Sequence, residues 1–435
     1  MQKALVLGAG SSGVSAAEFL LAKHYKVSLF DQNLALLKSD RGVLALKDKG
    51  VQIVETEAFI LPFSFDLVVA SPGFLVTENW RSKGRELIGE IELGARFLKN
   101  KAIAITGTNG KTTVTLLLEH VLNHASIPAA AVGNVGTPLT SHLLKAYDEN
   151  TVLVMELSSY QLETLSSKVF DAAVILNITP DHLDRYPTMQ EYATAKINLK
   201  NCLKENSPLY ADEATFHHFK ELFGDSKCSF FGFSKEADLY SDLENVYLKE
   251  KFEYTLPCAL RGKKSHDLEN MMAAYALAKE FNVSAKQFLE AFSLFKKPAH
   301  RIEFVREHQS VCYYDDSKGT NIAAVLKAVD FLKGPLYLIA GGVDKGSSYA
   351  PWKEAFKGKV QAVFLIGQAA KKIEAEIGQD VATYFVATLE EAVKKAAEMA
   401  KAGDSVLLSP GCSSYDMFKD YKARGSEFKR VVNSL

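Results

Sequence analysis

The sequence has no excess of charge of either sign, no long apolar run and few cysteines. Its 51 basic side chains offset 52 acidic ones to a net charge of −1, a balance that gives no support to a nucleic-acid partner. No apolar run approaches the roughly 20 residues that a membrane-spanning helix needs, and the start of the chain lacks the pattern of a signal peptide. We therefore expect a cytoplasmic protein without membrane insertion, and we expect a monomer.

The five cysteines are scattered along the chain and never form a C-x-x-C pair. An odd number of cysteines without close spacing predicts neither a disulfide framework nor a zinc site built on thiolates. We interpret them as small apolar side chains in a reducing compartment.

Short runs rich in valine, isoleucine and leucine alternate with longer amphipathic stretches along most of the 435 residues. Such alternation indicates parallel sheets with helical crossovers, so the predicted fold class is α/β. At roughly 150 residues per domain, the length predicts about three domains. We place them at residues 1–94, 95–297 and 298–435, and we interpret residues 228–262 as an antiparallel insertion or edge. The clearest strand patterns lie at residues 3–8, 27–31, 66–73, 101–106, 151–157, 172–178, 311–316, 335–342, 362–367 and 405–411.

A first glycine-rich turn, GAGSSG at residues 8–13, follows a predicted strand and precedes a predicted helix. Asp31 ends the next strand about 20 residues further on, which completes the fingerprint of a dinucleotide-binding turn. Glycines in such a turn let backbone N–H groups approach a diphosphate. NAD is one candidate ligand, but residues 1–94 hold only about half of a dinucleotide-binding fold, so a UDP-sugar fits better. A tight turn needed only for packing is the remaining alternative.

A second glycine-rich turn, GTNGKTT at residues 107–113, ends like a phosphate-binding loop, yet Ile105 stands where the first glycine of such a loop is expected. The turn nevertheless follows a predicted strand and precedes a predicted helix, as in a phosphate-binding loop. Lys111 is placed for the β- and γ-phosphates of ATP, and Thr112 offers a hydroxyl to Mg²⁺. Glu156 ends another buried strand, where a carboxylate reaches such a metal. Together these features predict binding of ATP and magnesium.

The loop after the strand at 172–178 carries Asp181, His182 and Asp184. Ligands of open α/β sheets collect at this end of the strands, so the loop is a candidate site. His182 is a candidate ligand of a second cation or a positioning group for a carboxylate. Lys196, on the helix that follows, would by itself be interpreted as a solvated lysine.

Seven segments, in order along the whole chain, resemble the motifs of the Mur ligase family. They are GTNGKTT (107–113), GNVGTPL (133–139), ELSSYQLE (156–163), NITPDHLDRY (177–186), AHR (299–301), DDSKGTN (315–321) and SPGCSSYDMFKDYKARGSEF (409–428). Mur ligases are cytosolic, ATP-dependent amide ligases that build the stem peptide of peptidoglycan. The resemblance implies a small Rossmann-like N-terminal domain for the UDP substrate, a central P-loop-type ATPase domain, and a Rossmann-like C-terminal domain for the incoming amino acid. It also accounts for the shortened phosphate loop.

The resemblance implies the residues that hold ATP and metal. ATP contacts are expected at Gly107, Thr108, Asn109, Gly110, Lys111, Thr112, Thr113, Asn270, Arg301, Asp316 and Lys318. Two Mg²⁺ ions are expected at Thr112, Glu156, His182 and Lys196. Lys196 matches a carbamylated lysine whose added carboxylate bridges the ions. The expected catalytic residues are Lys111, His182 and Lys196, with His182 either a base or part of the metal shell.

The resemblance also implies the residues that hold the two other substrates. The UDP substrate is expected at Ser11, Ser12, Asp31, Gln32, Ser71, Pro72, Gly73 and Asn134, and D-glutamate at Thr320, Lys345, Ser414, Tyr415 and Tyr421. Some positions depart from the family pattern. Asn33 stands where arginine is frequent, His266-Asp267 where H-N is frequent, and Tyr415 and Tyr421 where apolar residues are frequent.

The activity implied by the resemblance is ATP-dependent addition of D-glutamate to UDP-N-acetylmuramoyl-L-alanine through an acyl phosphate, a step of peptidoglycan synthesis that serves cell wall biogenesis, cell shape and cell division. A ligase that adds another residue to a UDP-muramoyl substrate, or one that extends a folyl chain, would use the same chemistry. An NAD(P)-dependent oxidoreductase that uses the turn at residues 8–13 is the alternative from a different class.

Overall fold

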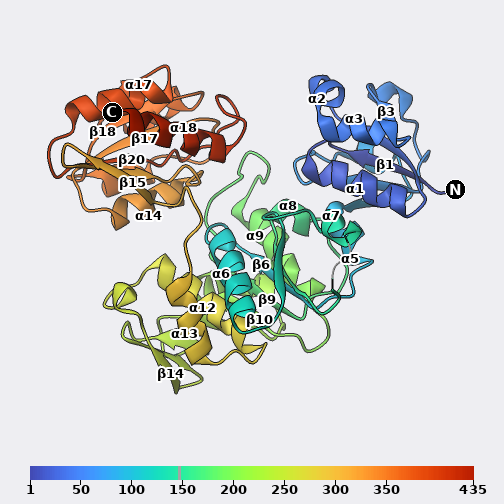
Figure 1. The fold of residues 1–435 in the computed structure, drawn as a ribbon, viewed down its shortest axis with the longest axis horizontal. Coiled ribbons are helices and arrows are strands. Elements are labelled where there is room, and N and C mark those ends of the chain that lie inside the picture. Colours follow the sequence, from blue (N-terminus) through green and yellow to red (C-terminus); the bar gives the residue numbers. More distant parts are fainter. Residues whose placement is uncertain (146–147) are drawn as a thin grey trace. The chain divides into compact units, whose positions relative to one another are not determined.

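The computed structural model describes residues 1–145 and 148–435, which form three separate sheets (Figure 1). The chain divides into two compact units. The first comprises Met1–Ile178 and Ala193–Phe295, and the second comprises Thr179–Tyr192 and Lys296–Leu435. The domain limits inferred from the sequence remain predictions.

The N-terminal sheet has five parallel strands in the order β3-β2-β1-β4-β5. Helices α1 and α3 pack on one face, and an aromatic cluster of Phe30, Phe74 and Trp80 covers the other. The strands are β1 (Lys3–Leu7), β2 (Lys26–Phe30), β3 (Gln52–Val54), β4 (Leu67–Ala70) and β5 (Leu87–Gly89), and the helices are α1 (Ser11–Ala22), α2 (Leu34–Ser39), α3 (Arg41–Asp48), α4 (Glu78–Arg81) and α5 (Glu90–Ala95).

A buried polar network joins this sheet to the central one within the first unit. The carboxylate of Glu90 accepts hydrogen bonds from the backbone N–H and the hydroxyl of Thr140, both at 2.7 Å. The Thr140 hydroxyl also lies 2.6 Å from that of Ser15 on α1. Buried polar groups need such partners, so this network fixes α1 against the segment that carries Thr140.

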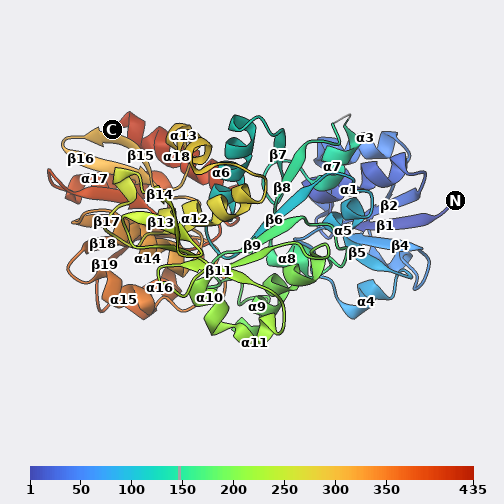
Figure 2. The ribbon, with the colours of Figure 1, turned by 90° about the horizontal axis from the view of Figure 1, so that it is seen from below.

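The central sheet has nine strands in the order β14-β13-β12-β11-β10-β9-β6-β8-β7. Figure 2 shows β7, β8, β6 and β9 following one another across it. Strands β6 to β12 are mutually parallel, whereas β13 and β14 are antiparallel to their neighbours. The strands are β6 (Ala102–Thr106), β7 (Ala129–Gly133), β8 (Val152–Glu156), β9 (Ala172–Ile175), β10 (Leu209–Asp212), β11 (Ser229–Gly232), β12 (Leu239–Ser241), β13 (Asn245–Leu248) and β14 (Lys251–Thr255).

Helices α6, α12 and α13 pack together on one face of the central sheet. Helix α12 is apolar on almost every side, and its residues from Met271 to Ala278 are all buried. A helix that is apolar all round belongs in the interior. The helices of this region are α6 (Lys111–His124), α7 (Leu139–Leu144), α8 (Ser159–Leu162), α9 (Met189–Ile197), α10 (Glu213–His218), α11 (Lys220–Phe223), α12 (His266–Lys279) and α13 (Ala285–Leu294).

The C-terminal sheet has six strands in the order β15-β16-β20-β17-β18-β19, with only β15 antiparallel. Successive side chains of β17 alternate between two cores. Leu336 and Leu338 face α14, α15 and α16, whereas Tyr337 and Ile339 face α17 and α18. The elements are β15 (Glu303–His308), β16 (Val311–Asp315), β17 (Leu336–Gly341), β18 (Val360–Ile366), β19 (Ala382–Phe385), β20 (Ser405–Leu408), α14 (Ile322–Phe331), α15 (Pro351–Phe356), α16 (Ala370–Ile377), α17 (Leu389–Met399) and α18 (Tyr421–Ser434).

The structure confirms the predicted α/β class and the strand patterns. The expectation of an antiparallel insertion at residues 228–262 was wrong for β11 and β12, which continue the parallel part of the sheet, and right for β13 and β14 at its edge. The sequence patterns missed strands β3, β5, β7, β10, β15 and β19. Across residues 1–145 and 148–435, every helix is too short or too polar to span a bilayer.

Candidate functional site

The second glycine-rich turn joins β6 to α6, as the sequence predicted. Gly110 precedes the helix with a φ of 89°, which favours glycine, and a Cβ built on it would lie 2.3 Å from Oδ1 of Asn270. Asn270 is buried on α12, so the loop and that helix fit together only without a side chain at Gly110. The N–H groups in the first turn of an α-helix have no partner within the helix and favour anionic oxygen, so the start of α6 is a candidate site for phosphate.

Asn177 holds this loop in shape, and the sequence patterns did not single it out. Its backbone oxygen accepts from the N–H of Thr108 at 2.7 Å. Its side chain accepts from the N–H of Asn109 at 3.0 Å and donates to the Asn109 carbonyl at 3.1 Å. The position of Asn177 just after the apolar run of β9 was the available signal, because polar residues at strand ends brace neighbouring loops.

Two lysines converge on one carbonyl oxygen of the loop. The Nζ atom of Lys111 donates to the carbonyls of Gly107 and Thr108, both at 2.8 Å. The Nζ atom of Lys196, on α9, donates to the same Gly107 oxygen at 2.8 Å, and Lys196 is only 1% exposed. The alternative of a solvated lysine at position 196 is therefore excluded, and the two candidate catalytic lysines of the first unit lie together.

Glu156 ends β8 next to β6 and is 1% exposed. Its Oε1 accepts a hydrogen bond of 2.6 Å from the amide of Asn134, whereas its buried Oε2 has no partner among the described residues. The hydroxyl of Thr112 is on the largely buried first turn of α6. An unpaired carboxylate oxygen and a hydroxyl are ligands that Mg²⁺ accepts, so these residues fit a magnesium ion.

The first glycine-rich turn lies where the strand order of the N-terminal sheet reverses, between β1 and β4, which is where open α/β sheets bind ligands. Asp31 braces the turn by accepting from the N–H of Ala9 at 2.6 Å. Ser71, after β4, donates its hydroxyl to the Gly8 carbonyl at 3.2 Å. Asp31 and Ser71 thus meet at the turn. The other expected UDP contacts in this sheet are Ser11, Ser12, Gln32, Pro72 and Gly73, all at least partly accessible.

In the second unit, Asp316 follows β16 and is buried. Its carboxylate accepts from the hydroxyl of Ser409 at 2.7 Å and from the N–H of Ile302 at 3.3 Å. Burial raises the pKa of the Asp316 carboxyl to about 7, against the opposing effects of the Ser409 hydrogen bond and the charge of Arg301. Asp316 and Arg301, two of the expected ATP contacts, therefore interact electrostatically. Lys318 of the same segment lies over the ring of Tyr421, with Nζ 4.2 Å from its centroid.

Two loops of this unit carry most of the expected amino-acid contacts. Lys345, after β17, donates to Asp181 at 3.1 Å and to the Thr320 hydroxyl at 3.4 Å. The backbones of Val343 and Ser413 exchange two hydrogen bonds of 2.9 and 3.1 Å, which tie the Lys345 loop to the loop of Ser414. Ser414 is buried, whereas the side chain of Tyr415 is 76% exposed and does not form a packed side of the expected amino-acid site.

The loop residue His182 has a φ of 58° and donates its backbone N–H to Asp181 at 3.0 Å. Burial by itself would raise the pKa of Asp181, but the charges of Lys345 and His182 and the hydrogen bond from Asn321 outweigh it and lower the pKa to about 2. Asp181 is thus a fixed carboxylate among the expected amino-acid residues.

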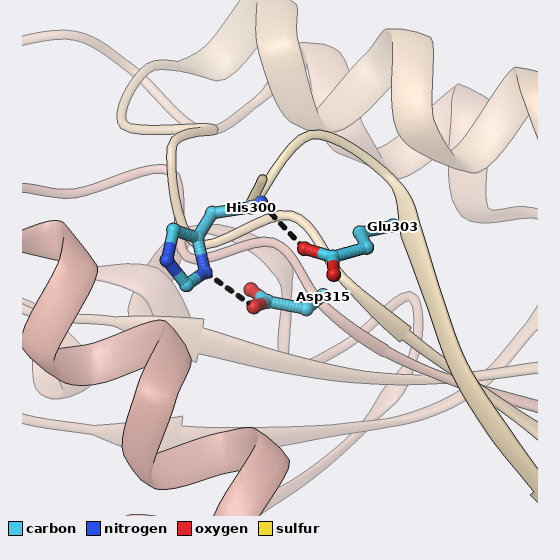
Figure 3. Close-up of side chains that lie close together, drawn as sticks. All are labelled: His300, Glu303 and Asp315. Carbon is cyan, nitrogen blue, oxygen red and sulfur yellow. Dashed lines mark hydrogen bonds and ion pairs between the residues drawn. The ribbon is translucent and has the colours of Figure 1, made fainter. Parts of the chain in front are cut away.

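His300, Glu303 and Asp315 form a cluster of possible metal ligands (Figure 3). Nδ1 of His300 lies 2.6 Å from Asp315, and the His300 N–H donates to Glu303 at 2.8 Å. The ammonium of Lys429 already lies 2.6 Å from Glu303 and 4.0 Å from Asp315. Because a lysine supplies the positive charge, we interpret the cluster as a support for the Arg301 segment.

Comparisons with known proteins agree with this geometry. Residues 105–278 match the Mur ligase middle domain, and residues 300–412 match the Mur ligase, glutamate ligase domain. A relative from Protochlamydia amoebophila, called UDP-N-acetylmuramoylalanine–D-glutamate ligase, is 47% identical over 100% of this chain and 98% of its own length. A relative of the same name from a Thermoanaerobacter species is 37% identical over 100% and 98%.

Solved structures of other ligases share the fold. The UDP-N-acetylmuramate-alanine ligase MurC from Thermotoga maritima aligns over 100% of both chains with a TM-score of 0.62 and 18% identity. MurF from Acinetobacter baumannii aligns over 98% of this chain and 93% of its own, with a TM-score of 0.63 and 15% identity. The matched domains and the full-length relatives, taken with the phosphate loop and its buried carboxylate, lead to one conclusion: the chain belongs to the Mur ligase family.

Proposed function

We propose that this protein is an ATP-dependent ligase that joins D-glutamate to UDP-N-acetylmuramoyl-L-alanine. The likeness that carries the proposal is the 47% identity, over the whole chain, to a relative named for that reaction. Peptidoglycan precursor synthesis is the corresponding process, and we propose that the protein acts in the cytoplasm as a monomer. Mur ligases depend on ATP and magnesium.

The chemistry requires activation because a carboxylate is a poor electrophile. The γ-phosphoryl group of ATP is transferred to the alanyl carboxylate, which gives an acyl phosphate and ADP. The amine of D-glutamate then attacks the carbonyl carbon, loses a proton, and the tetrahedral intermediate expels phosphate to leave the amide. Positioning and electrostatic stabilisation supply most of the catalysis of phosphoryl transfer.

The central loop supports the first step. The N–H groups that open α6 would bind the phosphate oxygens of ATP. Lys111, whose ammonium donates to the Gly107 and Thr108 carbonyls, would exchange these oxygens for those of the phosphates. Thr112 and Glu156 would hold magnesium, which offsets the charge that develops on the phosphoryl oxygens. The closely packed Gly110 and Asn270 keep the loop in the form that this binding requires.

Several finer assignments belong to the same proposal. Lys196 is proposed to carry a carbamate that bridges two Mg²⁺ ions, because its amine is buried beside the phosphate loop. His182 is proposed to act near the second ion. The turn at residues 8–13 and Ser71 are proposed to hold the UDP group, and the loops of Lys345 and Ser414 to hold D-glutamate.

Phosphate release from the purified protein with UDP-N-acetylmuramoyl-L-alanine, ATP, Mg²⁺ and single amino acids tests the proposal. Release is expected with D-glutamate and not with L-glutamate, and Lys111→Ala is expected to abolish it. Lys168→Ala, which removes an exposed lysine of the same region, is the control and should leave the rate unchanged. Release with L-glutamate but not with D-glutamate would contradict the proposed substrate.

A further inference from the structure

The backbone on either side of Arg301 adopts a left-handed conformation. His300 has a φ of 65° and Ile302 has a φ of 48°. Neither residue is a glycine, and for a β-branched isoleucine this conformation is a genuine outlier. Such strained residues persist only where the surrounding structure holds them, and they cluster at ligand sites. The contacts that hold this turn therefore determine the orientation of Arg301.

Three neighbouring residues hold the turn by hydrogen bonds, and two of them are themselves expected to contact ATP. Ile302 donates its backbone N–H to Asp316 at 3.3 Å, and the His300 carbonyl accepts from the N–H of Lys318 at 3.1 Å. The third is Glu303, whose carboxylate accepts from the N–H of His300 at 2.8 Å (Figure 3). Glu303 begins β15 and is only partly buried, so its side chain needs a further partner to keep this orientation.

Lys429 supplies that partner from helix α18. Its Nζ lies 2.6 and 2.7 Å from the two carboxylate oxygens of Glu303. It also lies 4.0 Å from the buried carboxylate of Asp315, which faces Glu303 across β15 and β16. Burial alone would raise the pKa of Glu303, but the hydrogen bonds from Lys429 and from the His300 N–H outweigh it and lower the pKa. Glu303 is thus a carboxylate fixed between two donors.

The ammonium of Lys429 also offsets the repulsion between two carboxylates. An oxygen of Glu303, an oxygen of Asp315 and a ring nitrogen of His300 all lie within 4.8 Å of one another. Like charges this close repel when water does not screen them, and the side chain of Lys429 is 26% exposed while that of Asp315 is fully buried. Loss of the ammonium is therefore expected to turn Glu303 towards water and to release the N–H of His300.

We propose that Lys429 and Glu303 form a positioning pair for Arg301, in which Lys429 fixes the Glu303 carboxylate and Glu303 fixes the strained turn that presents Arg301 to ATP. The inference rests on the proposed function and adds to it two residues that do not touch a substrate. The lysine takes the place that a metal ion would take among a histidine and two carboxylates.

The test measures the KM of each substrate in wild-type protein and in Lys429→Met, which keeps an unbranched chain and removes the ammonium. The KM for ATP is expected to rise about tenfold, the lower end of what the loss of a hydrogen bond to a charged group costs. The KM values for D-glutamate and for the UDP substrate are expected to stay within about twofold, as for substitutions away from a site. An unchanged KM for ATP, or a rise by the same factor for all three substrates, would overturn the proposal.

Glu303→Gln tests the pair itself, because the amide keeps an oxygen for the His300 N–H and loses the charge that binds Lys429. Two residues that act through one ion pair have effects that are not additive. The double variant with Lys429→Met should therefore raise the KM for ATP no more than the stronger single substitution does. If the two increases multiply, the residues act separately and the proposal is wrong.

Arg430→Met is the matched control, because it removes a cation from the next position of α18 that is 58% exposed and pairs with Glu427 at 2.7 Å. Its KM for ATP should equal that of wild type, and a rise as large as in Lys429→Met would reduce the effect to lost charge and overturn the proposal. If Lys429→Met does not fold, Glu303→Gln alone decides, and an unchanged KM for ATP then overturns the proposal. Wild-type protein that releases no phosphate with all three substrates would instead contradict the proposed function, so the two failures are distinguishable.

Discussion

Replacement of Glu156 by glutamine is expected to stabilise the metal-free protein and to remove its response to magnesium. The carboxylate is 1% exposed, and only Oε1 has a partner, Asn134, among the described residues. A buried polar group without a partner costs about 1–3 kcal/mol, and a charged one costs more. Glutamine keeps an oxygen for Asn134 and removes the charge, although its NH₂ group stays unpaired. We therefore expect the unfolding free energy to rise by about 1–2 kcal/mol.

Calorimetric unfolding with and without Mg²⁺ and ADP measures both effects. A ligand that binds only the folded state stabilises it by mass action, so wild-type protein should gain stability from Mg²⁺–ADP, and Glu156→Gln should gain much less. Glu119→Gln is the control, because Glu119 Oε1 accepts from the Ala131 N–H at 2.8 Å and the amide preserves that acceptor. If Glu156→Gln proves less stable than wild type without metal and responds equally to Mg²⁺–ADP, the assignment of Glu156 as a metal ligand is refuted.

Two further predictions concern ionisable groups. Lys196→Ala is expected to abolish turnover, and mass spectrometry of the native protein should find one added carbon dioxide on Lys196; full activity of the variant with no carbamate in the wild type would contradict the bridging role. Asp316 has a folded-state pKa raised from 3.8 to about 7, so its contribution to stability is present below pH about 4 and is lost as the pH rises through about 7. Asp316→Asn should remove this loss and raise the free energy of unfolding at neutral pH by up to roughly 4 kcal/mol, at about 1.4 kcal/mol per pKa unit. Chemical denaturation between pH about 4 and about 7 measures the free energy of unfolding of both proteins. The same pH dependence in Asp316→Asn and in wild type would refute this role of Asp316.

Much of the fold could be predicted because buried parallel strands need continuous apolar runs. Strand β17, with Leu336 to Gly341 entirely buried, is such a case. The missed strands carry weaker signals: β3 has three residues, β7 is mostly alanine, and three of the four residues of β19 are exposed. An edge strand has one neighbour and can expose a face to water, so its sequence need not be apolar.

The candidate site likewise contains some residues that local sequence patterns predict and some contacts that they do not. Lys111, Thr112 and Glu156 could be predicted because strand, loop and helix order is local. The contact of Gly110 with Asn270 and the pairing of Asp181 with Lys345 join residues 160 and 164 positions apart. No periodicity of the sequence specifies which loops meet, and these contacts become visible only when the sheets are assembled.

The two hydrogen bonds between Val343 and Ser413 have a consequence for engineering. They join the loop of Lys345 to the loop of Ser414, so the two loops form one structural unit although nearly 70 residues separate them in the chain. If only one loop is taken from a ligase with another amino-acid preference, these two hydrogen bonds would be disturbed and the second loop would shift. Chimaeras between family members should therefore transfer both loops together, and a directed-evolution library should vary them in pairs.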